Sequence, residues 1–170
     1  MLSPKLQDAL NDQINAEIHS GYIYLSMAAW FESRNLDGCA RWMRLQSQEE
    51  NMHGMKIFDY LGSRGARVKL KAVAAPDHDW PTPLACFEAA LAHEKSMTER
   101  IDRLAELAQT EKDHATDNLM RWYVNEQVEE EASVDDICQK LRLVGEDGMG
   151  LFMIDRELKQ RQPGDEAAGV

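Results

Sequence analysis

Residues 50–53 of the chain read Glu50-Asn51-Met52-His53, with a glutamate and a histidine three positions apart. Side chains at positions i and i+3 point to the same side of a helix, so this pair could reach one metal ion. Such a pair occurs by chance in many helices, and its meaning depends on the helix face that carries it. Here the face is largely apolar. It contains Leu36, Ala40, Met43, Ser47, Glu50, His53 or Gly54, Ile57 and Leu61.

Three other stretches show the same spacing of three and four between largely apolar residues, and each has a glutamate near its middle. The first stretch contains Glu17, the third contains Glu94, and the fourth contains Glu126 and Glu130. A carboxylate on an apolar face is costly unless it finds a partner or a metal ion. One such glutamate can be a helix-edge residue that reaches water. Glutamate on all four faces, none of which contains Lys or Arg, indicates a metal cluster instead.

The donor set favours particular metals. Carboxylate oxygens with a single imidazole nitrogen suit iron or manganese better than copper, and the lack of thiolates argues against structural zinc. Glu50 is the natural bridge, because a carboxylate has two oxygens and can hold two ions. Glu17 and His53 would then complete the coordination of one ion. Glu94 and Glu130 would complete that of the other.

Helix start and stop signals divide the chain into helices. Ser3-Pro4 and Thr82-Pro83 each place a capping residue before a proline at the first helical position. Asp37 can cap a second helix and Asp113 a fourth. The predicted helices run from Pro4 to about Arg34, from Asp37 to about Gly62, from Pro83 to about Thr110, from Asp113 to about Val144, and from about 147 to 159 for a short fifth helix.

A long connection, roughly Ser63 to Pro81, joins the two helix pairs. Tight turns make the helices of each pair antiparallel, whereas this connection can travel the length of the bundle and make the second and third helices parallel. We therefore predict an all-α fold. It is a four-helix bundle at about 4–144 with a long crossover and a short fifth helix, in a single domain of residues 1–170 with a frayed tail at 160–170.

Composition bounds the function. The chain has 170 residues, of which 44% are hydrophobic, and its net charge of -11 disfavours a nucleic-acid partner. No apolar stretch is long enough to span a bilayer, and no signal-peptide pattern follows Met1. Cys39, Cys86 and Cys138 form no CxxC pair and are odd in number, so a disulfide framework is not expected. These features predict a cytoplasmic protein.

At these residues the sequence resembles the ferritin family, in particular the bacterial non-haem ferritins, over nearly the whole chain. The resemblance implies a ferritin-like bundle with a ferroxidase centre of two iron ions. Its implied site residues are Glu17, Glu50, His53 and Glu94 as ligands, Tyr24 as a site tyrosine that can bond a ligand or give up an electron, and Gln127 near the second iron. It also implies a possible third iron at Glu49, Glu126, Glu129 and Glu130.

The implied activity is oxidation of Fe(II) by O2 or H2O2, followed by mineral growth inside a closed cage of two dozen subunits. Haem is not expected. Bacterioferritins ligate haem through a methionine directly after the glutamate of the ExxH pair, but Asn51 holds that place. Met52 lies one step further, about 100° round the helix.

Two alternative functions remain open at this point. One is a structural cage subunit without fast oxidation, and the other is a di-iron oxidase that does not store iron. The remaining histidines show no ligand pattern and are predicted at the surface or in turns. They are His19, His78, His93 and His114.

Overall fold

The computed structural model describes residues 2–164, and within them α-helix is the only regular secondary structure. The helices are α1 (Pro4–Glu32), α2 (Asp37–Ser63), α3 (Pro83–Thr110), α4 (His114–Val144) and α5 (Gly148–Leu158). The predicted all-α class is confirmed, with four long helices and a short fifth one. None of these helices combines the length and apolar character needed to cross a membrane, as judged over the described residues.

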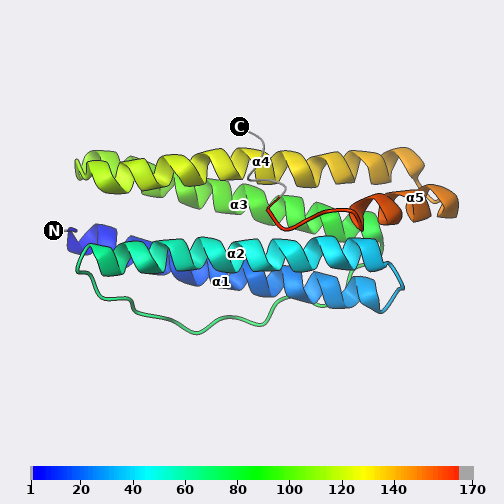
Figure 1. Cartoon of the computed structure of the whole chain (residues 1–170), viewed down its shortest axis with the longest axis horizontal. Coiled ribbons are helices and arrows are strands. Elements are labelled where there is room, and N and C mark those ends of the chain that lie inside the picture. The colour runs from blue at the N-terminus through cyan, green and yellow to red at the C-terminus, as the bar shows by residue number, and fades with distance from the viewer. Residues whose placement is uncertain (1, 165–170) are drawn as a thin grey trace.

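Two antiparallel pairs build the bundle (Figure 1). Helices α1 and α2 form one pair, and α3 and α4 form the other. The connection between α2 and α3 runs along the length of the bundle, so these two helices are parallel, as predicted (Figure 1). Asn11 of α1 fastens it, because the Asn11 Oδ1 accepts from the Lys69 amide at 2.6 Å and the Asn11 Nδ2 donates to the Arg67 carbonyl at 3.2 Å.

Short polar side chains begin three of the long helices. The Ser3 hydroxyl accepts from the Leu6 amide at 3.2 Å, and the Thr82 hydroxyl accepts from the Ala85 amide at 3.1 Å. The Asp113 carboxylate accepts from the Thr116 amide at 3.0 Å. Each of these bonds satisfies a backbone N–H that has no partner within its own helix, which is why the predicted starts of these helices hold.

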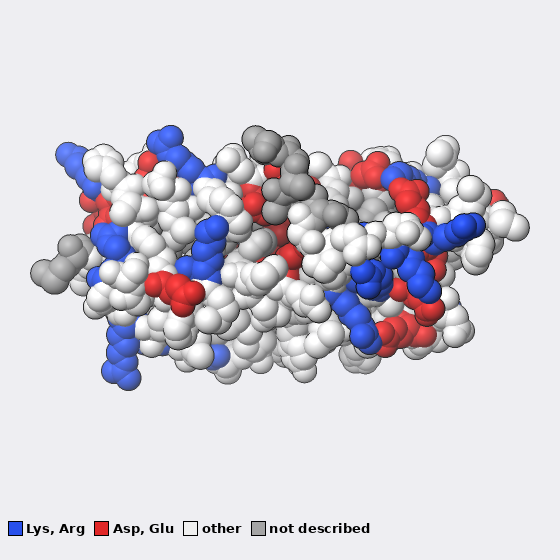
Figure 2. Space-filling model, viewed as in Figure 1, with Lys and Arg blue, Asp and Glu red and all other residues white. Residues whose placement is uncertain are grey.

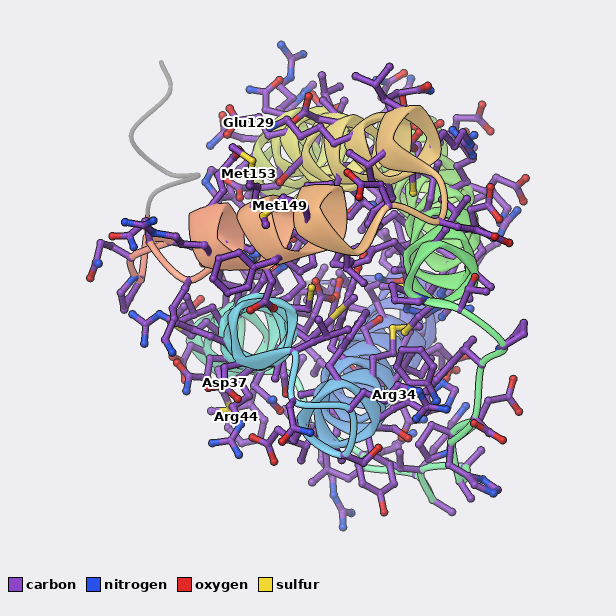
Figure 3. All side chains as sticks on the ribbon, turned by 90° about the vertical axis from the view of Figure 1, so that its right-hand side faces the viewer. Arg34, Asp37, Arg44, Glu129, Met149 and Met153 are labelled. Carbon is purple, nitrogen blue, oxygen red and sulfur yellow. The ribbon has the colours of Figure 1, made fainter. Side chains whose placement is uncertain are left out.

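Helix α2 begins differently. Its N-cap is Leu36, which makes no side-chain cap, so the prediction that Asp37 caps this helix is wrong. Instead, Oδ1 of Asp155, from α5, accepts from the Cys39 amide at 2.9 Å. Gly38 permits this approach, because a Cβ at this position would lie 1.7 Å from the Asp155 carbonyl oxygen. In the end-on view α5 lies beside the start of α2, which Asp37 marks (Figure 3).

The core has two apolar clusters separated by a polar layer. One cluster includes Phe31, Phe87 and Ile137 near the α5 end of the bundle. The other includes Leu10 and Ile101 near the opposite end. Polar and charged residues are buried between the clusters. They include Glu17, Glu50, His53, Glu94, Gln127 and Glu130.

The contact at Gly38 gives a prediction about stability. Gly38→Ala should force α5 away from α2 and lower the free energy of unfolding by about 1–3 kcal/mol, the usual range for overpacking. Urea unfolding followed by far-UV circular dichroism would measure the change. Gly62→Ala is the matched control in the same helix, because a Cβ there meets nothing within 4 Å. That variant should be neutral or more stable by up to about 1 kcal/mol, and equal effects of the two changes would contradict the proposed packing.

Candidate metal centre

Each of the four long helices contributes a buried glutamate to the polar layer. The exposed fractions of Glu17, Glu50, Glu94 and Glu130 are 2%, 1%, 0% and 2%. Every one of them lies near the middle of its helix, so the four helices bring the carboxylates to the same level of the bundle. His53 is 7% exposed and lies one turn after Glu50 on α2.

The side chains form two groups of three that could hold a metal ion. Glu17, Glu50 and His53 make one group, and Glu50, Glu94 and Glu130 make the other. In each group the donor atoms lie within 4.8 Å of one another. Glu50 belongs to both, so the structure brings together the residues that the sequence assigned to two ions, with the expected bridge between them. Their service as ligands stays a prediction.

Neutral donors hold the carboxylates in place. Gln13 Nε2 donates to Glu17 Oε1 at 2.8 Å, and the Tyr24 hydroxyl donates to Glu94 Oε1. Gln127 Nε2 lies 3.3 Å from Glu94 Oε2. These amide and hydroxyl groups orient the oxygens without adding positive charge of their own, so they would not compete with a cation for the carboxylates.

Burial shifts the acid–base properties of the glutamates. The pKa of Glu17 is raised from 4.5 to about 7, mainly by loss of solvation on burial; the hydrogen bond from Gln13 opposes this rise, and the neighbouring Glu94 charge adds to it. The pKa of Glu50 lies well above its usual value, because of burial first and then the charges of Glu130 and Glu94. A cation among these groups would favour their ionised forms, so the donor set fits a divalent metal ion.

His53 has the protonation state that a metal ligand requires. Burial, with a smaller contribution from the nearby Lys56 charge, lowers its pKa from 6.5 to about 4. The imidazole is therefore neutral at pH 7, which is the form that binds metals. The Tyr123 hydroxyl donates to the His53 carbonyl at 2.6 Å and fixes the backbone there. His53 Nδ1 lies 3.7 Å from Glu130 Oε1.

Of the residues predicted for a third ion, Glu130 belongs to one of these two groups, whereas Glu49, Glu126 and Glu129 belong to neither. Glu49 and Glu126 line a cavity of about 310 Å³ together with His53 and Glu130. Acidic side chains reach the surface near this level of the bundle, between α2 and α4 (Figure 2). Glu49 Oε2 pairs with Arg161 Nη2 at 2.5 Å, and Glu129 is not among the residues that line the cavity. Three of the four predicted residues therefore line one cavity, and a third ion there stays a prediction.

Several site residues escaped the sequence analysis. Three residues that contact the buried glutamates or His53 were not predicted, namely Gln13, Gln46 and Tyr123. Each is the sequence neighbour of a residue on the predicted apolar faces, and so it lay outside them. A search of the positions four residues before each glutamate would have found Gln13 and Gln46. Arg161 had no such signal, because its contacts with α2 lie more than a hundred residues away in the chain.

His93 was predicted at the surface or in a turn, but it lies within α3 and is half-buried. Its Nε2 lies 2.7 Å from the Ser20 hydroxyl, and its ring centre lies 6.4 Å from that of Tyr24. Burial lowers the pKa of His93 to about 4, so the ring is neutral at pH 7. It therefore packs against the tyrosine that bonds Glu94 and does not add charge to the centre.

Comparison with known proteins identifies the family. The Ferritin-like domain model matches residues 7–144. The chain is 42% identical to a bacterial non-heme ferritin of Bacteroides fragilis over 161 residues, which cover 95% of this chain and 100% of that protein. It is 38% identical to a bacterial non-heme ferritin of Staphylococcus aureus, again over 161 residues, with 95% and 97% covered.

Solved structures agree with this result. A crystal structure of an open-pore ferritin from the hyperthermophilic archaeon Archaeoglobus fulgidus has a TM-score of 0.94 and is 56% identical, covering 95% of this chain and 100% of that one. A humanized archaeal ferritin also has a TM-score of 0.94, at 53% identity, with 95% and 99% covered. The family model, the relatives and the fold agree, and the chain belongs to the ferritin family.

Proposed function

We propose that this protein is an iron-storage subunit that binds two Fe(II) ions in its polar layer and oxidises them. Dioxygen or hydrogen peroxide is the oxidant, and the ferric product is kept as mineral inside a cage built from copies of the chain. The observation that carries the proposal is the pair of buried donor groups that share Glu50. Iron storage by this route is consistent with the ferritins that the chain resembles.

The donor chemistry assigns the two positions. Glu17 and His53 would hold one Fe(II), Glu94 and Glu130 would hold the other, and the Glu50 carboxylate would bridge them. Carboxylate oxygens and a neutral imidazole suit iron in both its ferrous and ferric states. Two Fe(II) ions release two electrons together, which is the number that reduces dioxygen to peroxide or peroxide to water. The paired arrangement therefore matches the electron count of the oxidant.

Tyr24 and Gln127 would support the second position. Both donate to Glu94, and burial with the neighbouring Glu94 charge raises the pKa of Tyr24 well above 10, so its hydroxyl stays protonated. A protonated hydroxyl fixes the carboxylate that faces the metal. The family resemblance also implies that Tyr24 could give up one electron, and its hydrogen bond to Glu94 would link it to the second position.

A third iron ion at Glu49, Glu126, Glu129 and Glu130 would compete with the Arg161 guanidinium for Glu49. Arg161 holds the Glu49 carboxylate, so an ion that uses Glu49 must first displace a guanidinium. Binding at the third position should for this reason be weaker than at the two positions that share Glu50.

Assembly into a cage needs apolar surface on the outside of the subunit. Helix α5 offers Met149, Phe152 and Met153, whose exposed fractions are 66%, 61% and 66%. Met149 and Met153 lie along one side of the helix (Figure 3). Exposed apolar side chains gathered on one element are typical of contacts between subunits. The buried, free Cys39, Cys86 and Cys138 suit the reducing cytoplasm where we place the protein.

Removing the bridge should abolish fast oxidation. In Glu50→Ala both donor groups lose a member. Changing a residue that only supports a metal ligand typically lowers activity by about 10- to 100-fold. The initial rate of Fe(II) oxidation in Glu50→Ala should fall by more than that. Stopped-flow absorbance after mixing the Fe(II)-loaded protein with oxygenated buffer would measure it. Glu99→Ala, which removes a glutamate from the exposed surface of α3, is the control. An unchanged rapid phase in Glu50→Ala would rule out the assigned centre, and a slow rate in the unaltered protein would favour a structural cage subunit.

Metal binding should expel protons at mildly acidic pH. The raised pKa of Glu17, about 7, means that its carboxyl is mostly protonated at pH 6 and mostly ionised at pH 8. Because ligands bind in the ionised form, the apparent affinity should fall as pH drops through 7, and more protons should be released at pH 6 than at pH 8. Calorimetric titration with Zn(II), in buffers of different ionisation enthalpy, would count them. Equal proton release at both values would contradict the assignment of Glu17.

A further inference from the structure

The segment after α5, residues 159–164, turns back toward the middle of the bundle (Figure 1). Arg161 anchors it and is only 9% exposed. The Arg41 side chain donates to the Arg161 carbonyl at 3.1 and 3.2 Å, and the Arg161 guanidinium carbon lies 4.6 Å from the Trp42 ring centre. Contacts with both its backbone and its side chain therefore fix the position of Arg161 against α2.

Besides its contact with the Trp42 ring, the Arg161 guanidinium donates hydrogen bonds to three residues of α2. Its Nη1 donates to the Trp42 carbonyl at 3.2 Å. Its Nη2 donates to Gln46 Oε1 at 3.0 Å and pairs with Glu49 Oε2 at 2.5 Å. The contact with Gln46 matters most, because Gln46 is itself in contact with the candidate metal centre.

Gln46 points its amide nitrogen at two of the buried carboxylates. Gln46 Nε2 lies 3.1 Å from Glu130 Oε1 and 3.3 Å from Glu50 Oε1. Only one orientation of this amide satisfies both sides. If the amide were reversed, its oxygen would face two carboxylates and its NH2 group would face a guanidinium that can only donate. Arg161 therefore determines which end of Gln46 the glutamates meet.

We propose that Arg161 is a positioning residue of the metal centre, acting through Gln46 to hold Glu50 and Glu130 in place when the C-terminal segment is docked. The inference rests on the proposed function, because it assumes that these glutamates hold metal ions. It adds a regulatory link: the docked segment strengthens metal binding, and bound metal must strengthen docking by the same factor. Groups that orient metal ligands commonly change metal affinity by about 10- to 100-fold.

The first test measures Zn(II) affinity by calorimetry and needs no oxidation. Arg161→Gln should weaken the ion at Glu50, Glu94 and Glu130 by about 10-fold or more, and the other ion less, because Gln46 contacts only the shared ligand of that group. Lys159→Gln is the control, since it removes the same charge from the same segment but touches Asp37 and not Gln46. Unchanged affinities in Arg161→Gln, or equal losses in both variants, would overturn the proposal.

A double-mutant cycle separates action through Gln46 from a general loss of packing. Gln46→Leu alone should cost about as much affinity as Arg161→Gln. Adding Arg161→Gln to the Gln46→Leu protein should then cost less than about twofold more, because coupled residues are not additive. If the two losses simply multiply, Arg161 does not act through Gln46, and the proposal fails.

A further measurement uses the unaltered chain and so does not depend on a variant that folds. Zn(II) should slow amide hydrogen exchange in residues 159–164, and no protection there would contradict the link. The same experiments distinguish the two proposals. If the unaltered protein binds two ions and Glu50→Ala removes them, but Arg161→Gln has no effect, only the role of Arg161 falls. If the unaltered protein binds no Zn(II) that depends on Glu50, both proposals fall.

Discussion

The repulsion among Glu17, Glu50, Glu94 and Glu130 must be offset in the middle of a bundle where each carboxylate is almost fully buried. Burial of one unpaired carboxylate is already costly, and here the charges also raise one another's pKa. Protons can reduce the repulsion, but bound cations offset it while keeping the oxygens ionised. The apolar clusters on either side supply the stability that lets the fold tolerate this layer.

The side chains that donate hydrogen bonds to the buried carboxylates do not neutralise their charge. Gln13, Gln46, Gln127 and Tyr24 donate hydrogen bonds to the carboxylates, and all four are uncharged. A lysine or arginine in direct contact would neutralise the site and compete with metal ions. Arg161 stands one residue further out, behind Gln46, where it can orient the donors without occupying the metal positions. At Glu49, by contrast, it makes direct contact and competes with any third ion.

Local signals made much of the fold predictable. Ser3-Pro4, Thr82-Pro83 and Asp113 start helices through contacts within three residues, and helical spacing placed the four glutamates on inward faces. What escaped prediction depends on contacts between distant parts of the chain. Asp155 caps α2 from α5, and Arg161 reaches Gln46 from a segment that was expected to be frayed. Periodicity reports which face of a helix is buried, but it does not report which later segment covers it. The rest of the predicted tail, residues 165–170, lies outside the described part of the chain.

The most direct measurement is a crystal structure of the protein soaked anaerobically with Fe(II), with anomalous diffraction recorded at the iron edge. We predict two iron peaks on either side of the Glu50 carboxylate, one beside Glu17 and His53 and the other beside Glu94 and Glu130. Full-strength iron only in the cavity beside Glu49, or no peak between the four helices, would show that the buried carboxylates do not form the metal centre.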